Sequence, residues 1–194
     1  MTQGYDLLLL VADRRELYHL LKESKQESDR FYKLERGNKK VAIFITGVGK
    51  NAIKRSQKKI IAIANDATRI INVGNTGSLK NHKFGDIIQV GQVIGSNGKE
   101  IITLNKTTDN VLVTVNSIQD KRKLIKQYPT ADIVDMELFY ISKQVDIDKL
   151  YSYKIVLDTF NTNPKIILTK LILPFLIRIN SKKLSNFIKT AYLY

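Results

Sequence analysis

Acidic residues that could move protons stand near the ends of apolar runs in this sequence. Glu16 lies shortly after the run Leu7–Val11, and Asp158 closes the run Lys154–Leu157. A third acidic segment, Asp135–Glu137, stands where a helical pattern begins. Two carboxyl groups in different environments can divide the roles of acid and base at neutral pH. The same residue types also have structural uses, because an acid is favoured in the first turn of a helix and aspartate commonly caps one.

Two glycine-containing segments, Gly47–Gly49 and Gly74–Gly77, also follow apolar runs. Glycine lets a backbone approach a ligand at a distance that a side chain would prevent. A tight turn between a strand and a helix has the same need for glycine. The residues alone leave both explanations open.

Apolar runs of strand length alternate with helical patterns along the chain. The predicted strands are Leu7–Val11, Phe31–Leu34, Val41–Thr46, Arg69–Val73, Gly85–Ile94, Glu100–Leu104, Val111–Val115, Ile133–Val134 and Lys154–Leu157. The predicted helices start around Leu17 and cover Asn51–Ala64, Lys121–Tyr128, Glu137–Val145 and a long C-terminal region. This alternation favours an α/β fold, a three-layer α/β/α sandwich with a central, mixed and largely parallel sheet in a single domain over residues 1–194. Ligands of such sheets bind beyond the carboxyl ends of the strands.

Composition excludes several classes of protein. The chain of 194 residues is 43% apolar and 26% charged, which disfavours disorder, collagen-like repeats and a coiled-coil rod. It contains no cysteine, so disulfides, thiolate zinc sites and a cysteine nucleophile are excluded. The N-terminus lacks a signal-peptide pattern, and the most apolar stretch, Ile166–Ile179, is interrupted by charged residues and is too short to span a membrane. We therefore expect a cytoplasmic protein.

The chain is strongly basic, with a net charge of +14. Such a charge favours nonspecific association with nucleic acid or with an anionic membrane, and a biased genome composition explains it equally. Two groups of cations lie on predicted helices, namely Lys50, Lys54, Arg55, Lys58 and Lys59, and then Lys182, Lys183 and Lys189. Solvated helix faces are their usual explanation, since no nucleic-acid-binding motif accompanies them. The apolar stretch before Lys182 could also lie on a membrane surface, although packing against the sheet is more common.

The order of these segments resembles the nucleoside phosphorylase and nucleosidase superfamily, and within it the 5′-methylthioadenosine/S-adenosylhomocysteine nucleosidases. Those enzymes carry SGIGK-like, INTGSAGGL-like, GD(I/V)-like, VEMEA-like and ISD-like segments in this order. The matching segments here are Thr46–Lys50, Ile71–Leu79, Gly85–Ile87, Val134–Glu137 and Val156–Asp158. The resemblance spans most of the chain and implies the phosphorylase-like α/β/α fold.

The resemblance also implies roles for individual residues. Glu16 falls on the glutamate that activates the attacking water, and Asp158 falls on the acid that protonates N7 of the departing purine. Met136 and Glu137 fall on the pair that holds the ribose hydroxyls. The resemblance adds the neighbouring Asp135 to the site, with further pocket residues at Val48, Asn75, Gly77, Ile118 and Leu168. It requires no metal and no organic cofactor, and it implies a small-molecule purine nucleoside as substrate and a homodimer.

The sequence departs from the family pattern at positions that bear on activity. Leu157 replaces a serine before the catalytic aspartate, and the loss of that serine removes a hydrogen bond that would orient the acid. Ile118 replaces an aromatic residue that stacks on the base, which lowers base affinity. Asn75, Asp135 and Leu138 replace a serine, a glutamate and an alanine. The stretch between Val93 and Val111 is shorter than in the family, so another subunit could supply part of the pocket.

Three functions therefore stay open. The first is hydrolysis of the N-glycosidic bond of a purine nucleoside of the 5′-methylthioadenosine or S-adenosylhomocysteine type. The second is phosphorolysis, which Asn72 disfavours because the phosphorylase branch often has an arginine there, although Arg14 and Arg15 keep it open. The third is a catalytically weak member that binds a nucleoside, a nucleic acid or another protein.

Overall fold

The computed structural model describes residues 4–104, 108–117, 119–159 and 172–194. Within these residues the strands of one mixed sheet are β1 Tyr5–Val11, β2 Lys25–Ser28, β3 Phe31–Arg36, β4 Lys39–Ile45, β5 Ala67–Ser78, β6 Ile87–Gln89, β7 Gln92–Ile94, β8 Ile101–Thr103, β9 Val111–Thr114, β10 Ile133–Asp135 and β11 Leu150–Asp158. The helices are α1 Tyr18–Leu21, α2 Gly49–Asn65, α3 Lys121–Gln127, α4 Leu138–Ser142 and α6 Ile172–Ile188. Shorter turns are the 3-10 helices η1 Arg14–Leu17 and η2 Ile147–Lys149 and the π-helical η3 Lys189–Leu193.

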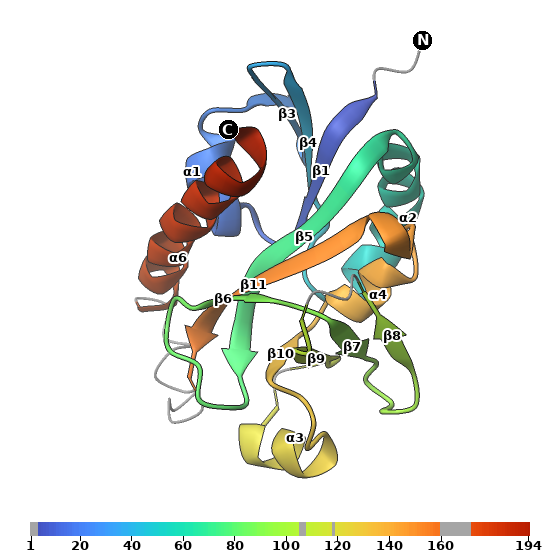
Figure 1. Cartoon of the computed structure of the whole chain (residues 1–194), viewed down its shortest axis with the longest axis vertical. Coiled ribbons are helices and arrows are strands. Elements are labelled where there is room, and N and C mark those ends of the chain that lie inside the picture. Colours follow the sequence, from blue (N-terminus) through green and yellow to red (C-terminus); the bar gives the residue numbers. More distant parts are fainter. Residues whose placement is uncertain (1–3, 105–107, 118, 160–171) are drawn as a thin grey trace.

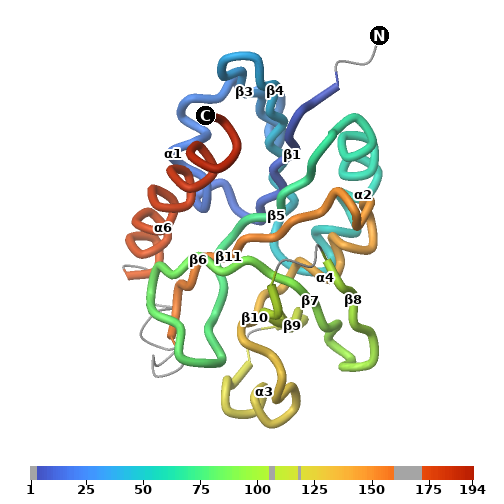
Figure 2. The backbone as a smooth tube through the Cα atoms, viewed as in Figure 1, coloured from blue at the N-terminus to red at the C-terminus, as the bar shows by residue number. Residues whose placement is uncertain are grey.

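The sheet is central and is covered by helices on both faces, as the sequence predicts (Figures 1 and 2). Along β1, Leu8 and Leu10 pack in one apolar cluster with side chains of α2 and α4. The alternate residues of β1, such as Leu9, pack in a second cluster with η1, α1 and α6. Successive side chains of a strand point to opposite faces, so the continuous apolar run of β1 buries both faces at once. The predicted α/β/α sandwich is confirmed.

The long strand β5 organises the sheet, because it has different neighbours along its length. On one edge it pairs in parallel with β11 over most of its length. On the other edge it pairs in parallel with β1 as far as Val73, and in antiparallel with β10 only from Gly77 onward. The backbone of Gly74, Asn75 and Thr76 therefore faces a gap between β1 and β10. That gap lies at the carboxyl end of β1, where a ligand site is expected.

Several strands differ from the sequence-based prediction. The strand β5 continues to Ser78, although the prediction ended it at Val73 and placed Gly74–Gly77 after the strand. The predicted strand Gly85–Ile94 is two strands, because β6 pairs with β11 whereas β7 pairs with β8 and β9. The change of partner occurs at Gly91, where a Cβ would lie 1.8 Å from the backbone oxygen of Thr108. The strand β2 was not predicted, because its four residues are all exposed and polar and so lack an apolar alternation.

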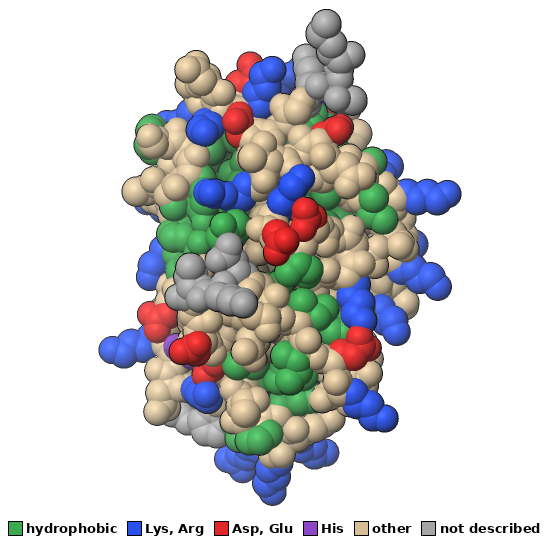
Figure 3. All heavy atoms as spheres, turned by 45° about the vertical axis from the view of Figure 1, so that its right-hand side comes forward, with side chains coloured by type: hydrophobic (Ala, Val, Ile, Leu, Met, Phe, Trp, Pro, Cys, Tyr) green, Lys and Arg blue, Asp and Glu red, His purple; other side chains and the backbone are tan. Residues whose placement is uncertain are grey.

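The predicted cationic helix faces are solvent-exposed. All five basic residues of α2 are exposed, and so are Lys182 and Lys183 of α6, whereas Lys189 pairs with Glu23. In Figure 3 the Lys and Arg side chains stand apart over much of the visible face and gather at its lower end, where α3 lies. Among the described residues, no helix is long and apolar enough to cross a membrane. The part of the apolar stretch before Ile172 lies outside the described residues, and the buried side of α6 packs against the sheet through Leu184 and Ile188.

Candidate active site

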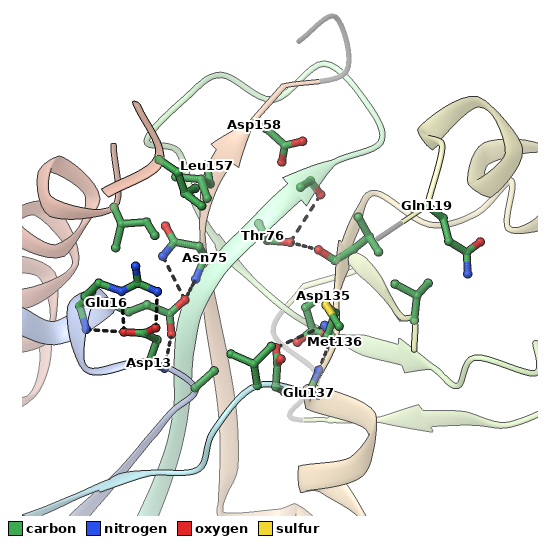
Figure 4. Close-up of a pocket in the computed structure, with 18 of the residues that line it drawn as sticks. Asp13, Glu16, Asn75, Thr76, Gln119, Asp135, Met136, Glu137, Leu157 and Asp158 are labelled. Atoms are coloured by element: carbon green, nitrogen blue, oxygen red, sulfur yellow. Dashed lines mark hydrogen bonds and ion pairs between the residues drawn. The ribbon is translucent and has the colours of Figure 1, made fainter. Parts of the chain in front are cut away.

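A cavity of about 320 Å³ lies in the gap beside β5. This volume is at the lower end of the range for small-molecule sites. The predicted site residues that the structure describes all line it, namely Glu16, Val48, Asn75, Gly77, Asp135, Met136, Glu137 and Asp158. The other two, Ile118 and Leu168, lie outside the described residues. In Figure 4, Glu16 lies on one side of β5, Met136 and Glu137 lie on the other, and Asp158 stands at the end of β11.

Glu16 is held by two elements. It is the third residue of η1, and its Oε2 accepts a hydrogen bond from the backbone N–H of Asp13, which caps that turn in return. Its Oε1 accepts from the backbone N–H of Asn75 at 2.8 Å and from the Asn75 side-chain amide at 3.0 Å. A Cβ at Gly74 would approach both carboxylate oxygens at 3.2 Å, so glycine leaves the room that this carboxylate uses.

Burial raises the pKa of Glu16, although hydrogen bonds from Asn75 and the charge of Lys154 oppose the shift. A carboxylate with a raised pKa is a stronger base than one in water. The fixed contacts with Asn75 and Asp13 set the orientation of this base before any substrate arrives. The site can therefore remove a proton from a molecule held beside β5.

Asn180 of α6 fixes the orientation of Asn75. Its side-chain amide donates to Asn75 Oδ1 at 2.9 Å and to the backbone oxygen of Val156 at 3.2 Å, and Asn180 is almost fully buried. Because Asn75 Oδ1 accepts from Asn180, its own amide N–H is directed to Glu16. The sequence shows no sign of this contact, since Asn180 lies 105 residues from Asn75 in an apolar helix.

Glu137 faces the same cavity from the start of α4. Its Oε1 accepts from the backbone N–H of Gly49 at 2.9 Å, and Gly49 has a φ of +79° that glycine adopts readily. Burial, together with the nearby charges of Asp135 and Glu16, raises the pKa of Glu137 to about 7. The carboxylate can accept hydrogen bonds from ligand hydroxyl groups, and it does so best when ionised.

Glu137→Gln is expected to stabilise the protein above pH 7. The pKa of Glu137 is near 4.5 in the unfolded chain and about 7 in the folded protein. The folded protein therefore loses stability as the pH rises between these values, because the unfolded chain ionises first. The shift corresponds to a gain on the order of 3 kcal/mol at pH 8 and little gain at pH 4.5. Urea denaturation at both pH values measures it. Glu100→Gln, at an exposed acid, is the control, and an unchanged pH dependence in Glu137→Gln would contradict the argument.

Asp135 lines the cavity, but its carboxylate is used within the protein. Its Oδ2 pairs with Lys154 Nζ at 2.8 Å and accepts from the backbone N–H of Leu138, and its Oδ1 accepts from Thr114 Oγ1 at 2.7 Å. The side chains of Asp135 and Lys154 are 1% and 2% exposed. Asp135 thus holds the start of α4, and with it Glu137, rather than presenting a free carboxylate.

Lys154 is a member of this network that sequence analysis missed. It lies in the middle of β11, where its flanking residues are apolar. Its positive charge acts against the rise that burial causes in the pKa of both Glu16 and Glu137. The available signal was the charge itself, because a lysine inside a buried strand requires a partner.

Asp158 ends β11 at the opposite wall of the cavity. Its Oδ1 would lie 2.8 Å from a Cβ at Gly77, so glycine at that position makes room for the carboxylate. Its Oδ2 pairs with Lys121 Nζ at 2.6 Å. The sequence predicted that Leu157 removes an orienting hydrogen bond; the structure shows that Lys121, which sequence analysis did not single out, contacts the carboxylate instead.

Apolar residues complete the cavity. Val115 directly follows β9, Leu124 comes from α3, and Leu173 and Ile177 come from α6. None of the described residues between Val93 and Val111 lines the cavity. Val48 lines the cavity and is still 57% exposed, which leaves that side open. The expected homodimer stays a prediction.

Solved structures share this architecture almost end to end. An Asp→Asn variant of a Chlamydia trachomatis 5′-methylthioadenosine/S-adenosylhomocysteine nucleosidase (MTAN) matches with a TM-score of 0.77 and 18% identity over 97% of each chain. The chain has the fold of these nucleosidases. A Helicobacter pylori MTAN variant with 5′-methylthioadenosine in its active site matches with a TM-score of 0.76 and 15% identity over 97% of this chain and 100% of that one. A putative 5′-methylthioadenosine/S-adenosylhomocysteine nucleosidase from Borrelia burgdorferi, bound to adenine, matches with a TM-score of 0.76 and 19% identity over 95% and 99%.

Comparison of the sequence finds fewer similar proteins than comparison of the structure. No protein-family model matches the chain, and no curated protein matches it. The nucleosidase fold is therefore reached through the structure, and the order of short segments along the chain agrees with it.

Proposed function

We propose that the protein hydrolyses the N-glycosidic bond of a purine nucleoside of the 5′-methylthioadenosine or S-adenosylhomocysteine type and releases the free base. The observation that carries the proposal is the convergence of Glu16, Glu137 and Asp158 on one cavity from three different elements. Two further acids line the wall, and both are used within the protein, because Asp135 is paired with Lys154 and Asp13 is paired with Arg15.

The three carboxyl groups suit the charges of this reaction. Cleavage builds positive charge on the sugar and negative charge on the base, so an acid must supply a proton to the base and a base must take one from water. Asp158 protonates N7 of the purine, and Glu16, with its raised pKa, takes the proton of the attacking water. Glu137 accepts hydrogen bonds from the ribose hydroxyls, which orients the sugar and stabilises its developing charge.

Proteins with this fold bind such ligands. The H. pylori variant holds 5′-methylthioadenosine in its active site, and a C. trachomatis Asp→Asn variant is also bound to that nucleoside. The B. burgdorferi protein is bound to adenine, the base that such a nucleoside would release. These ligands support a purine nucleoside as the substrate class here.

The arginines near the cavity favour water over phosphate as the nucleophile. Arg15 is paired with Asp13 by two side-chain hydrogen bonds of 2.9 and 2.5 Å, and Arg14 is paired with Asp29. Asn72 is buried in the sheet, where its amide donates to the backbone oxygen of Leu10. Phosphate recognition needs cationic or amide donors directed at the anion. Arg15 lines the cavity, but its Nε and Nη2 donors are taken by Asp13, and Arg14 and Asn72 are bound to other partners.

A chromatographic assay tests the proposal. Purified protein is incubated with methylthioadenosine, S-adenosylhomocysteine, adenosine or inosine, each with and without phosphate, and the free base is measured. Release without phosphate is expected; release only with phosphate identifies a phosphorylase, and no release from folded protein contradicts catalysis on these nucleosides. Asp158→Asn is the matched control, because it removes the proton donor at nearly constant shape and should lower release by at least about a hundredfold.

A further inference from the structure

The ammonium group of Lys121 is enclosed by oxygen atoms at the end of β11. Its Nζ donates to the backbone oxygen of Asp158 at 3.2 Å and to that of Thr159 at 2.8 Å, and it pairs with Asp158 Oδ2 at 2.6 Å. An ammonium group has three N–H donors, so these contacts use all of them. Lys121 therefore has no donor left for a ligand and acts on Asp158 instead.

This ion pair is shielded from water. The Lys121 side chain is 9% exposed and that of Asp158 is 19% exposed. Charges that are removed from water interact more strongly and are held in one geometry. Lys121 is also the first residue of α3, whose Leu124 lines the cavity, so the pair fixes this wall to the end of β11.

The two oxygens of Asp158 have different surroundings. Oδ2 is taken by Lys121, whereas Oδ1 lies against Gly77, a residue of the cavity wall. Among the described residues, no hydrogen bond is made to Oδ1. The contact with Lys121 thus restrains rotation of the carboxyl group and leaves one oxygen for the leaving base.

We propose that Lys121 is the positioning residue of Asp158. It holds Oδ2 while Oδ1 carries the proton, orients Oδ1 toward the base, and stabilises the carboxylate that forms when this proton passes from Oδ1 to N7. This inference rests on the proposed function. It assigns to a lysine on a separate helix the orienting contact that Leu157 cannot make, because a leucine side chain has no hydrogen-bonding group.

A pair of substrates separates this role from a purely structural one. A purine nucleoside needs a proton on its leaving base, whereas 4-nitrophenyl riboside releases 4-nitrophenolate, which leaves without one. Lys121→Met is expected to lower kcat for the purine nucleoside by at least about tenfold and to change kcat for 4-nitrophenyl riboside by less than about twofold. The ratio of the two rates does not depend on the fraction of folded protein.

Two further variants sharpen the test. Lys121→Gln keeps a donor for the backbone oxygens and removes the charge. It is expected to lower the rate for the purine nucleoside relative to the rate for 4-nitrophenyl riboside, and it serves if Lys121→Met does not fold. In the Asp158→Asn background, Lys121→Met should cause no further loss, because the group that it positions is no longer an acid. Lys123→Met, at an exposed lysine of the same helix, is the matched control and should leave the ratio unchanged.

The outcomes are distinguishable from those of the proposed function. Equal losses for both substrates, or a loss that adds to that of Asp158→Asn, would overturn the role of Lys121. If the wild-type protein releases no base from any nucleoside, the proposed function fails and adenine affinity, measured by calorimetry, decides the inference. A loss of about fivefold or more in Lys121→Met that is absent in the Asp158→Asn background supports it, and an unchanged affinity overturns it.

Discussion

Glu16→Gln is expected to lower the rate of base release by at least about a hundredfold while substrate affinity changes by less than about threefold. The amide keeps the shape of the carboxylate and can still accept from the backbone N–H of Asn75 through its oxygen. It cannot take a proton from water. A residue that acts on the nucleophile contributes to the transition state more than to the bound substrate, so the loss falls on kcat. Initial rates over a range of substrate concentrations measure both quantities.

Glu23→Gln is the control for this experiment. Glu23 is a surface acid that pairs with Arg36 and Lys189 and does not line the cavity, so its amide variant should turn over normally. Glu16→Gln also replaces the oxygen that accepts from the Asp13 N–H by an amide group, and the weakened cap alone should cost about 1 kcal/mol of stability. Removal of a buried charge whose pKa is raised offsets this cost at neutral pH. A Glu16→Gln variant that keeps more than half of the wild-type rate would remove the glutamate from the mechanism.

The ends of β1 and β11 were predictable from the sequence because burial of both sheet faces leaves an apolar run that stops where the chain reaches the surface, whereas β5 continues beyond its apolar run to Ser78. Glu16 and Asp158 could be located by this signal, and the order of segments along the chain brought them into one site. The gap between β1 and β10 could not be predicted in this way. It depends on which strands neighbour β5, and pairing between distant strands leaves no local pattern.

The supporting residues were harder to predict than the acids that they support. Lys121 follows its N-cap Asp120 and lies in a stretch rich in lysine, where its neighbours Arg122 and Lys123 are exposed. Nothing in the spacing separates the buried lysine from the exposed ones, because the distinction arises only when α3 meets the end of β11. Leu157 has no group that could orient Asp158, but a contact from a distant helix, such as that of Lys121, lies beyond a residue-by-residue comparison.

Lys154→Met is expected to destabilise the folded protein by about 3–5 kcal/mol at pH 7, because it leaves the Asp135 carboxylate buried without its cation. Methionine is close to lysine in length, so the loss of charge dominates the loss of packing. Urea denaturation measures the difference. Lys143→Met, which removes an exposed ion pair with Glu100, is the control and should change stability by less than about 1 kcal/mol. A similar value for Lys154→Met would contradict a buried ion pair.

The double variant Asp135→Asn/Lys154→Met tests the pair directly. Removing both charges should restore about half or more of the stability lost in Lys154→Met, since no charge is then buried alone and asparagine can still accept from the Leu138 N–H. Loss of Lys154 alone also removes the charge that lowers the pKa of Glu137 and Glu16. In Lys154→Met the pKa of Glu137 should therefore rise above 7, so that less of its carboxylate is ionised at neutral pH and nucleoside affinity recovers as the pH is raised. The buried lysine thus links the stability of the fold to the charge state of the site.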